Sequence, residues 1–316
     1  MKQKMWAYLL HLGDNMWGDP AIDVENTKNF PELLTDDVVW RQVVDFLPAQ
    51  GFNTVLVDVG DGMQYESHPE ISVKGAWSKD KLRKELDYMR SIGLTPIPKL
   101  NFSAAHDSWL GEYSRMLSTS IYYKVVRDVI MEVAEVFDYP KFFHLGMDEE
   151  EAKIQSGLTY ITVRQRELLW HDFKFMFDVC EEVGARPWIW ADLCWDEKYR
   201  DDFMKRMPKS VLMSNWSYGP VKKNADGSYR SVGYEAYRML EAAGFEQMPC
   251  CSTIEGWDKS PYETMQLGKE EIAPERLVGY LTAPWCNPRK NMQYRLLNDA
   301  QHFGVAKKEY YPEECK

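Results

Sequence analysis

The sequence predicts an α/β fold, a (β/α)8 TIM barrel, with residues 1–316 forming a single domain and no separate N-terminal domain. Apolar strand-like segments alternate with amphipathic helical segments along the whole chain, and 316 residues suffice for one barrel of about 250 residues. Polar and aromatic residues also gather where the predicted strands end. A doubly wound open sheet is the alternative, but no glycine-rich phosphate loop follows the first strand.

The predicted strands are short apolar runs bounded by glycine, proline or polar residues. The fourth begins after Pro140, and its apolar run ends at Gly146. The eight strands are expected at residues 5–12, 53–62, 94–101, 141–147, 187–192, 211–216, 247–253 and 277–284.

The helical segments are marked by apolar stripes at helical spacing and by start and stop residues. Asp36 and Ser78 begin the first two, and Gly51 and Gly93 end them. Further helical patterns cover residues 118–137, 159–183, 233–243, 262–271 and 291–303. These are seven ranges, and the alternation with eight strands predicts eight helical segments in all.

The hydrophobic, charged and aromatic content of the chain limits the kinds of molecule that it is expected to bind. Hydrophobic residues make up 45% and charged residues 28%, as in ordinary globular proteins, so we expect no membrane insertion. The net charge of −11 argues against nucleic acid and anionic membrane surfaces, because both need a basic face. Aromatic residues reach 14%, with 12 Trp, and surplus Trp at strand ends commonly binds flat ligand faces such as sugar rings.

The six cysteines show neither metal-ligand spacing nor a disulfide framework, so we interpret most of them as small buried residues and predict no disulfide. The chain starts with basic residues and a short apolar run that lacks a small-residue cleavage site, which favours a first strand. The compartment is left open: periplasmic or secreted if a signal peptide was removed, otherwise cytoplasmic. The oligomeric state is also left open.

Four consecutive carboxylates, Asp148 to Glu151, follow the fourth predicted strand. Such a cluster resists burial unless a site uses it. Glu150 and Glu151 are expected to be solvated near the start of the next helix, where the helix dipole favours negative charge. Asp148 and Glu149 can serve one pocket where the chain starts to turn, and two carboxylates in different environments suit general acid catalysis beside charge stabilisation.

Residues 144–150, HLGMDEE, resemble the His-x-Gly-Gly-Asp-Glu signature of the family 20 glycoside hydrolases, the β-N-acetylhexosaminidases. The resemblance covers most of the chain in the correct order. It extends to residues 51–71 at the second strand, to residues 78–106 around the third, and to WIWAD at the fifth. The matching positions are Asn53, Asp61, Pro69, His106, Trp190, Asp192, Trp216 and Trp285.

The sequence also departs from this family. The family's first strand ends with an Arg that grips sugar hydroxyls, whereas the comparable position lies near Asp14, and we expect Asp14 or Lys99 to replace its contacts. Lys99 and Asn101 stand where acids are expected, and Ala105 replaces a Gly. The seventh strand has no clear Tyr-x-Asp, which leaves Tyr218 as a candidate for the acetamide-holding tyrosine.

The resemblance implies a glycosidase that cleaves terminal N-acetylhexosamine, or a related sugar, from glycans by a substrate-assisted retaining mechanism. Glu149 would be the acid/base and Asp148 would stabilise the acetamide. A carbohydrate is the expected partner, and no metal or other cofactor is expected. The residues expected to bind substrate are Asp61, His106, His144, Trp190, Asp192, Trp216 and Trp285. The main cavity should lie at the carboxyl ends of the strands and include Glu149 and these three Trp.

Three questions stay open at this point. His144 could contact the substrate or be a hydrogen-bonded core group beneath the site. The protein could be a non-catalytic carbohydrate-binding barrel, although retention of Asp148 and Glu149 counts against this. It could also be a metal-dependent barrel hydrolase, although the tight His pairing usual for a metal is absent from the sequence. The metal alternative would use His11, His106, His144, Asp148 and Asp192.

Overall fold

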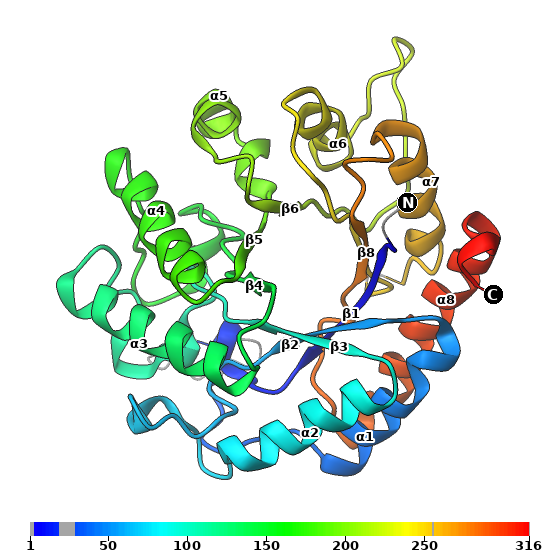
Figure 1. Ribbon diagram of the computed structural model, residues 1–316. Coiled ribbons are helices and arrows are strands. Elements are labelled where there is room, and N and C mark those ends of the chain that lie inside the picture. The colour runs from blue at the N-terminus through cyan, green and yellow to red at the C-terminus, as the bar shows by residue number, and fades with distance from the viewer. Residues whose placement is uncertain (1–2, 19–28, 255, 316) are drawn as a thin grey trace.

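The computed structural model describes residues 3–18, 29–254 and 256–315. Within these residues, eight parallel strands form a nearly closed barrel and helices surround it, which confirms the predicted (β/α)8 fold (Figure 1). The strands are β1 (Met5–His11), β2 (Thr54–Asp58), β3 (Thr95–Lys99), β4 (Phe142–His144), β5 (Arg186–Trp190), β6 (Leu212–Ser214), β7 (Cys250–Cys251) and β8 (Gly279–Thr282).

The helices lie outside the strands (Figure 1). They are α1 (Asp37–Phe46), α2 (Lys79–Ser91), α3 (Ser120–Val136), α4 (Glu167–Glu182), α5 (Glu197–Arg206), α6 (Val232–Ala242), α7 (Ser260–Glu271) and α8 (Gln293–Tyr310). The caps of α1 and α2 are as predicted, because the Asp36 side chain accepts the N–H of Val39 and Ser78 accepts that of Lys81. The predicted ranges include no helix at α5.

The strands pair in the order β6-β5-β4-β3-β2-β1-β8-β7. The seam between β6 and β7 is held by separate backbone hydrogen bonds, from Met248 N–H to the Met213 carbonyl (2.8 Å) and from Cys250 N–H to the Asn215 carbonyl (2.9 Å). Most strands are shorter than predicted, because regular pairing stops before the loops that carry the polar residues. The fourth strand covers three residues instead of the predicted seven.

Alternating side chains divide the apolar residues into two clusters, one inside the barrel and one between the strands and helices. On β1, Ala7 and Leu9 belong to the interior cluster, whereas Tyr8 and Leu10 belong to the outer one. All six cysteines are free thiols, and every one except Cys315 is buried. Among the described helices, none has the length and apolar character to cross a bilayer.

Candidate active site

The loop after β4 turns through residues with left-handed backbone. Gly146 has φ of +72°, Met147 +71° and Glu149 +56°. A Cβ at Gly146 would lie 2.0 Å from Asn101 Oδ1, so glycine is required there. The two non-glycine residues hold a costly conformation, which persists only where the surroundings enforce it. This turn allows the consecutive side chains of Asp148 and Glu149 to reach the same cavity.

That cavity has a volume of about 390 Å³ and is formed by residues that follow six different strands. It therefore lies at the carboxyl ends of the strands, as predicted, and two of the three expected Trp line it. The lining residues are Trp17, His106, Asp148, Glu149, Trp216, Tyr218, Ile254 and Trp285. Trp17 and Ile254 were not predicted to line the cavity. Trp17 lies in the loop after the first strand, so it follows the same pattern as Trp216 and Trp285, which are also Trp residues near strand ends.

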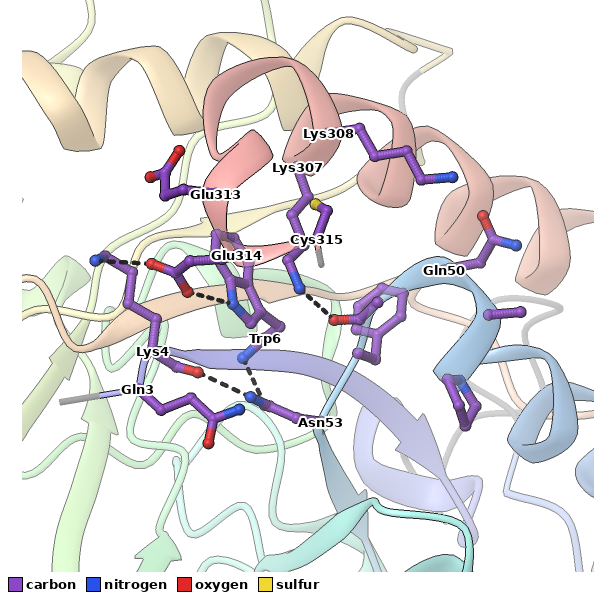
Figure 2. A pocket seen from close by; sticks show the side chains of 14 residues that line it. Gln3, Lys4, Trp6, Gln50, Asn53, Lys307, Lys308, Glu313, Glu314 and Cys315 are labelled. Carbon is purple, nitrogen blue, oxygen red and sulfur yellow. Dashed lines mark hydrogen bonds and ion pairs between the residues drawn. The ribbon is translucent and has the colours of Figure 1, made fainter. Parts of the chain in front are cut away.

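The prediction that this would be the main cavity is wrong, because other hollows have a larger volume. Hollows of about 640 and 590 Å³ lie at the opposite end of the barrel, around residues that precede the strands, such as Lys4 and Asn53 (Figure 2). The larger hollow is lined by the consecutive acids Glu313 and Glu314, but Glu313 is exposed and Glu314 is bonded to Lys4 and to the indole N–H of Trp6. We place the candidate site by its chemistry, since catalytic groups of such barrels lie at the carboxyl ends of the strands.

The loop after β3 holds the acid pair in place. Asn101 Nδ2 donates to Asp148 Oδ1 at 2.9 Å, and the Ser103 hydroxyl donates to the Asp148 carbonyl oxygen. An amide at position 101 can donate this bond, whereas the acid expected there would repel Asp148. His106 Nε2 lies 2.9 Å from Glu149 Oε2 and 3.5 Å from Asp148 Oδ2.

Electrostatics favour a charged His106 and a neutral Asp192. Burial opposes the charge of His106, but the carboxylates of Asp148 and Glu149 outweigh it and raise the pKa of the imidazole above its usual value. Burial, and next the negative charge of Asp148, raise the pKa of Asp192 to about 8. The acid pair therefore has a positively charged imidazole on one side and an uncharged carboxyl group behind it.

Aromatic rings fix the walls of the cavity. The indole N–H of Trp285 donates to the Tyr218 hydroxyl at 3.0 Å, and Tyr218 stacks on Trp216 with ring centroids 5.4 Å apart. Trp17 contacts Trp285 edge-on at 6.2 Å. Planar apolar walls of this kind suit the C–H faces of a pyranose ring.

Four residues expected to bind substrate are not among the described residues that line the cavity. Trp190 is 1% exposed and lies behind Trp285, with ring centroids 5.7 Å apart. The buried Asp61 accepts from Asn15 Nδ2 at 2.6 Å, and burial raises the pKa of Asp61 to about 7. Asp192 contacts the acid pair from behind. Direct contacts of these residues with a substrate stay predictions.

The fourth is His144, which has the geometry of a buried, hydrogen-bonded core group. Its Nδ1 accepts the Gly146 N–H at 3.0 Å, and its ring lies 4.7 Å from that of Trp190. Burial, and next the charge of Lys99, lower the pKa of His144 well below its usual value. A neutral imidazole therefore supports the turn that carries Asp148 and Glu149.

The two side chains expected to replace the missing Arg are engaged elsewhere. Lys99 is fully buried and forms an ion pair with Asp58, which also lies 3.3 Å from His11 Nδ1. Asp14 Oδ1 accepts from Arg289 Nη2 at 2.9 Å. Neither Lys99 nor Asp14 is among the described residues lining the cavity. An Arg does reach the end of β1, but it comes from the loop after β8.

The prediction that Glu150 is a solvated acid near a helix start is wrong. Glu150 is buried, and its Oε1 accepts from Arg164 Nη1 at 2.5 Å and from the Ala104 N–H at 3.0 Å. Arg164 also donates to Asp172 Oδ2 at 2.8 Å. A buried guanidinium needs such partners, so Glu150 ties the loops after β3 and β4 to the segment before α4. Glu151 is exposed, and α4 begins only at Glu167.

The His, Asp and Glu side chains at the strand ends can be compared with the needs of a metal ion. In the described part of the chain, no group of three or more His, Cys, Asp or Glu side chains is placed to hold a metal ion. His11 faces Asp58, His106 faces the acid pair, and His144 supports the backbone of the β4 loop. Of the residues in the metal alternative, His106, Asp148 and Asp192 lie near one another, whereas His11 and His144 are engaged elsewhere.

Neither a profile of a known protein family nor a curated protein sequence matches this chain. Solved structures do match in fold. The β-N-acetylhexosaminidase from Bacteroides fragilis NCTC 9343 is 12% identical, with a TM-score of 0.64, over 99% of this chain and 71% of that one.

Two further matches are similar. The family 20 exo-β-N-acetylglucosaminidase from Vibrio harveyi, solved with N-acetylglucosamine, is 13% identical with a TM-score of 0.59, over 99% of this chain and 58% of that one. The N-acetyl-β-hexosaminidase of Streptomyces plicatus, solved with Thio-NAglucal, is 12% identical with a TM-score of 0.61, over 99% and 69%. Nearly the whole chain thus has the barrel fold found in family 20 β-N-acetylhexosaminidases.

Proposed function

We propose that this protein is a glycoside hydrolase that removes terminal N-acetylhexosamine from glycans by a substrate-assisted, retaining mechanism. One observation carries the proposal: Asp148 and Glu149, consecutive on a left-handed turn, line the same aromatic-walled cavity at the carboxyl ends of the strands. The fold shared with β-N-acetylhexosaminidases supports it. Fold alone does not assign chemistry, so the proposal rests on the site.

Glu149 is the general acid and base in this mechanism. Its side chain keeps 30% of its surface exposed at the cavity, whereas that of Asp148 keeps 10%. Glu149 protonates the glycosidic oxygen as the leaving group departs, and the substrate's acetamide oxygen attacks the anomeric carbon to form a cyclic intermediate. The Glu149 carboxylate then takes a proton from water, which opens this intermediate with overall retention of configuration.

Asp148 stabilises the acetamide in this scheme. Positive charge develops on the acetamide nitrogen as its oxygen attacks, and a nearby carboxylate lowers the energy of that state. The bond from Asn101 fixes the orientation of Asp148. Tyr218 is the proposed partner of the acetamide oxygen, because its hydroxyl accepts from Trp285 and can donate its own hydrogen. Trp216 and Trp285 supply the apolar walls for the ring.

The test is a panel of aryl β-glycosides with and without a 2-acetamido group. The proposed mechanism predicts turnover of N-acetylhexosaminides and little turnover of plain glucosides or galactosides, which lack the internal nucleophile. A thiazoline mimic of the cyclic intermediate should bind more tightly than the free sugar. Equal turnover of both sugar classes would refute substrate assistance. Binding of N-acetylglucosamine without any turnover would favour the non-catalytic carbohydrate-binding alternative.

A further inference from the structure

We propose that Asp192 is a positioning residue that holds the general acid Glu149 in its working conformation, an inference that rests on the proposed function. Asp192 follows β5 and is buried. Its Oδ2 accepts the backbone N–H of Glu149 at 2.7 Å, while Trp216 Nε1 lies 3.4 Å from its Oδ1. Asp192 is not among the described residues lining the cavity, so it acts through Glu149 rather than on the substrate.

The backbone of Glu149 needs such support. Its φ of +56° lies in the left-handed region, which is unfavourable for a residue other than glycine and persists only where the surroundings enforce it. The same turn includes Met147, whose φ is +71°. Without a partner for the Glu149 N–H, relaxation toward ordinary backbone angles would rotate the side chain away from His106 and the cavity.

The acid pair is held from two sides. On the β3 side, Asn101 and Ser103 bind the side chain and carbonyl oxygen of Asp148. On the β5 side, Asp192 binds the next amide along the chain. Adjacent residues anchored to two different strands have little freedom to move, which is the geometric restraint that general acid catalysis needs.

Asp192 also links the acid to a wall of the cavity. The same carboxyl group faces the indole N–H of Trp216, which lines the cavity, and the amide of Glu149. Burial and the charge of Asp148 favour the neutral form of Asp192 near neutral pH, so this group can lie behind Asp148 and Glu149 without adding a negative charge of its own. A neutral carboxyl still has a carbonyl oxygen that accepts the Glu149 N–H.

The test compares Asp192→Ala with Asp192→Asn. Alanine removes the acceptor, whereas the amide oxygen of asparagine can still accept the Glu149 N–H. We expect Asp192→Ala to lower kcat on an aryl N-acetylhexosaminide about 10²-fold with little change in KM, because a displacement of about 1 Å costs that much. Asp192→Asn should recover most of that loss. If alanine prevents folding, Asp192→Ser, which is too short to reach the amide, replaces it.

The matched control is Asp196→Ala. Asp196 lies on the same β5–α5 connection, and its side chain accepts the Lys198 N–H at 2.8 Å as the cap of α5. This variant should lose stability but keep the kcat of the unaltered protein. A wild-type kcat in Asp192→Ala, or equal losses in the alanine and asparagine variants, would overturn the positioning role.

A second readout does not depend on turnover. Hydrogen–deuterium exchange of the peptide around residues 145–152 should be faster in Asp192→Ala and stay slow in Asp192→Asn and Asp196→Ala. If the unaltered protein cleaves no aryl glycoside, the proposed function fails and exchange alone decides the inference. Faster exchange confined to the alanine variant then supports it, and equal exchange in all variants overturns it.

Discussion

The two ends of the barrel differ in what their polar groups contact. At the amino end of the strands, the hollow of about 640 Å³ is surrounded by groups that bond to one another (Figure 2). Asn53 accepts the Trp6 N–H at 2.8 Å and donates to the Lys4 carbonyl at 2.8 Å, and Lys307 donates to the Gly51 carbonyl at 2.6 Å. At the carboxyl end, Asp148 and Glu149 face a smaller cavity.

This contrast shows that neither the volume of a hollow nor a strained backbone is enough by itself to identify a functional site. The larger hollow lies at the amino end, and left-handed non-glycine residues occur at both ends, for example at Tyr139 (φ +54°) and at Glu149 (φ +56°). What differs is that the strained turn after β4 presents carboxylates to a cavity with aromatic walls. We therefore expect substitutions at the carboxyl end to change turnover and those at the amino end to change stability.

The largest effect is expected for Glu149→Gln. Glutamine has the same shape but no acidic proton to transfer to the leaving group, so kcat on substrates with poor leaving groups should fall roughly 10²–10⁴-fold. The melting temperature should change little. Glu151→Gln is the matched control, because Glu151 is an exposed acid two residues away. Equal kcat values for the two variants would refute the role of Glu149, since the acid that faces the cavity would then matter no more for turnover than an acid on the surface.

Asp148→Asn should lower kcat on N-acetylhexosaminides about 10²-fold, within the range for losing one preorganised electrostatic contact. The oxygen of the introduced amide would turn toward the donating Nδ2 of Asn101, which leaves an NH₂ group facing the acetamide N–H. The steady-state kcat and the affinity for a thiazoline inhibitor should fall together. An affinity that is unchanged while kcat falls would refute the role of Asp148 at the acetamide.

At the amino end, Asn53→Ala should destabilise the fold by about 2 kcal/mol, because it removes the hydrogen-bond partners of Trp6 N–H and the Lys4 carbonyl. The kcat should stay at its wild-type value. Urea unfolding and kinetics on the same preparations test this. Glu313→Ala, an exposed position in the same hollow, should change neither quantity. A loss of kcat in Asn53→Ala without a loss of stability would show that the two ends are functionally coupled.

Trp285→Ala should raise KM about tenfold, because a ring contact of about 1.4 kcal/mol would be lost with little effect on the acids. Trp285→Phe keeps an aromatic face and removes the N–H that Tyr218 accepts, so it separates ring contact from hydrogen bonding. If both variants raise KM equally, the hydrogen bond to Tyr218 matters more than the apolar face.

The features predictable from the sequence were those set by local pattern. Caps at Asp36 and Ser78 and the alternation of strands and helices depend on near neighbours, so the fold could be predicted. The acids that follow a buried strand were placed at the cavity for the same reason. Strand ends were overextended because apolar residues continue past the last ladder bond, as Leu145 does after β4.

Other features depend on contacts that a single sequence does not reveal. Glu150 is buried because Arg164, fourteen positions later, folds back onto it. Trp190 is the last residue of β5 and is buried, whereas Trp285 follows β8 and lines the cavity. The pairing of Asp14 with Arg289 joins opposite ends of the chain. Each of these features depends on segments that are brought together only by the closed barrel, so none could be predicted from the sequence pattern.

The smallest expected effect is the contribution of charged His106 to the pH dependence of the unfolding free energy. Because Asp148 and Glu149 raise the pKa of folded His106, its charge adds stability that is fully present below about pH 6.5 and is lost as pH rises through the higher folded pKa. Asp61 and Asp192 have raised pKa values of about 7 and about 8, so their ionisation also lowers the stability of the folded protein as pH rises. The pH dependence of the unfolding free energy of the unaltered protein therefore does not isolate His106. The difference in unfolding free energy between the unaltered protein and His106→Gln removes their contribution. It should be larger at pH 6 than at pH 9, and a difference that grows with pH would show that the acid pair does not hold a charged imidazole.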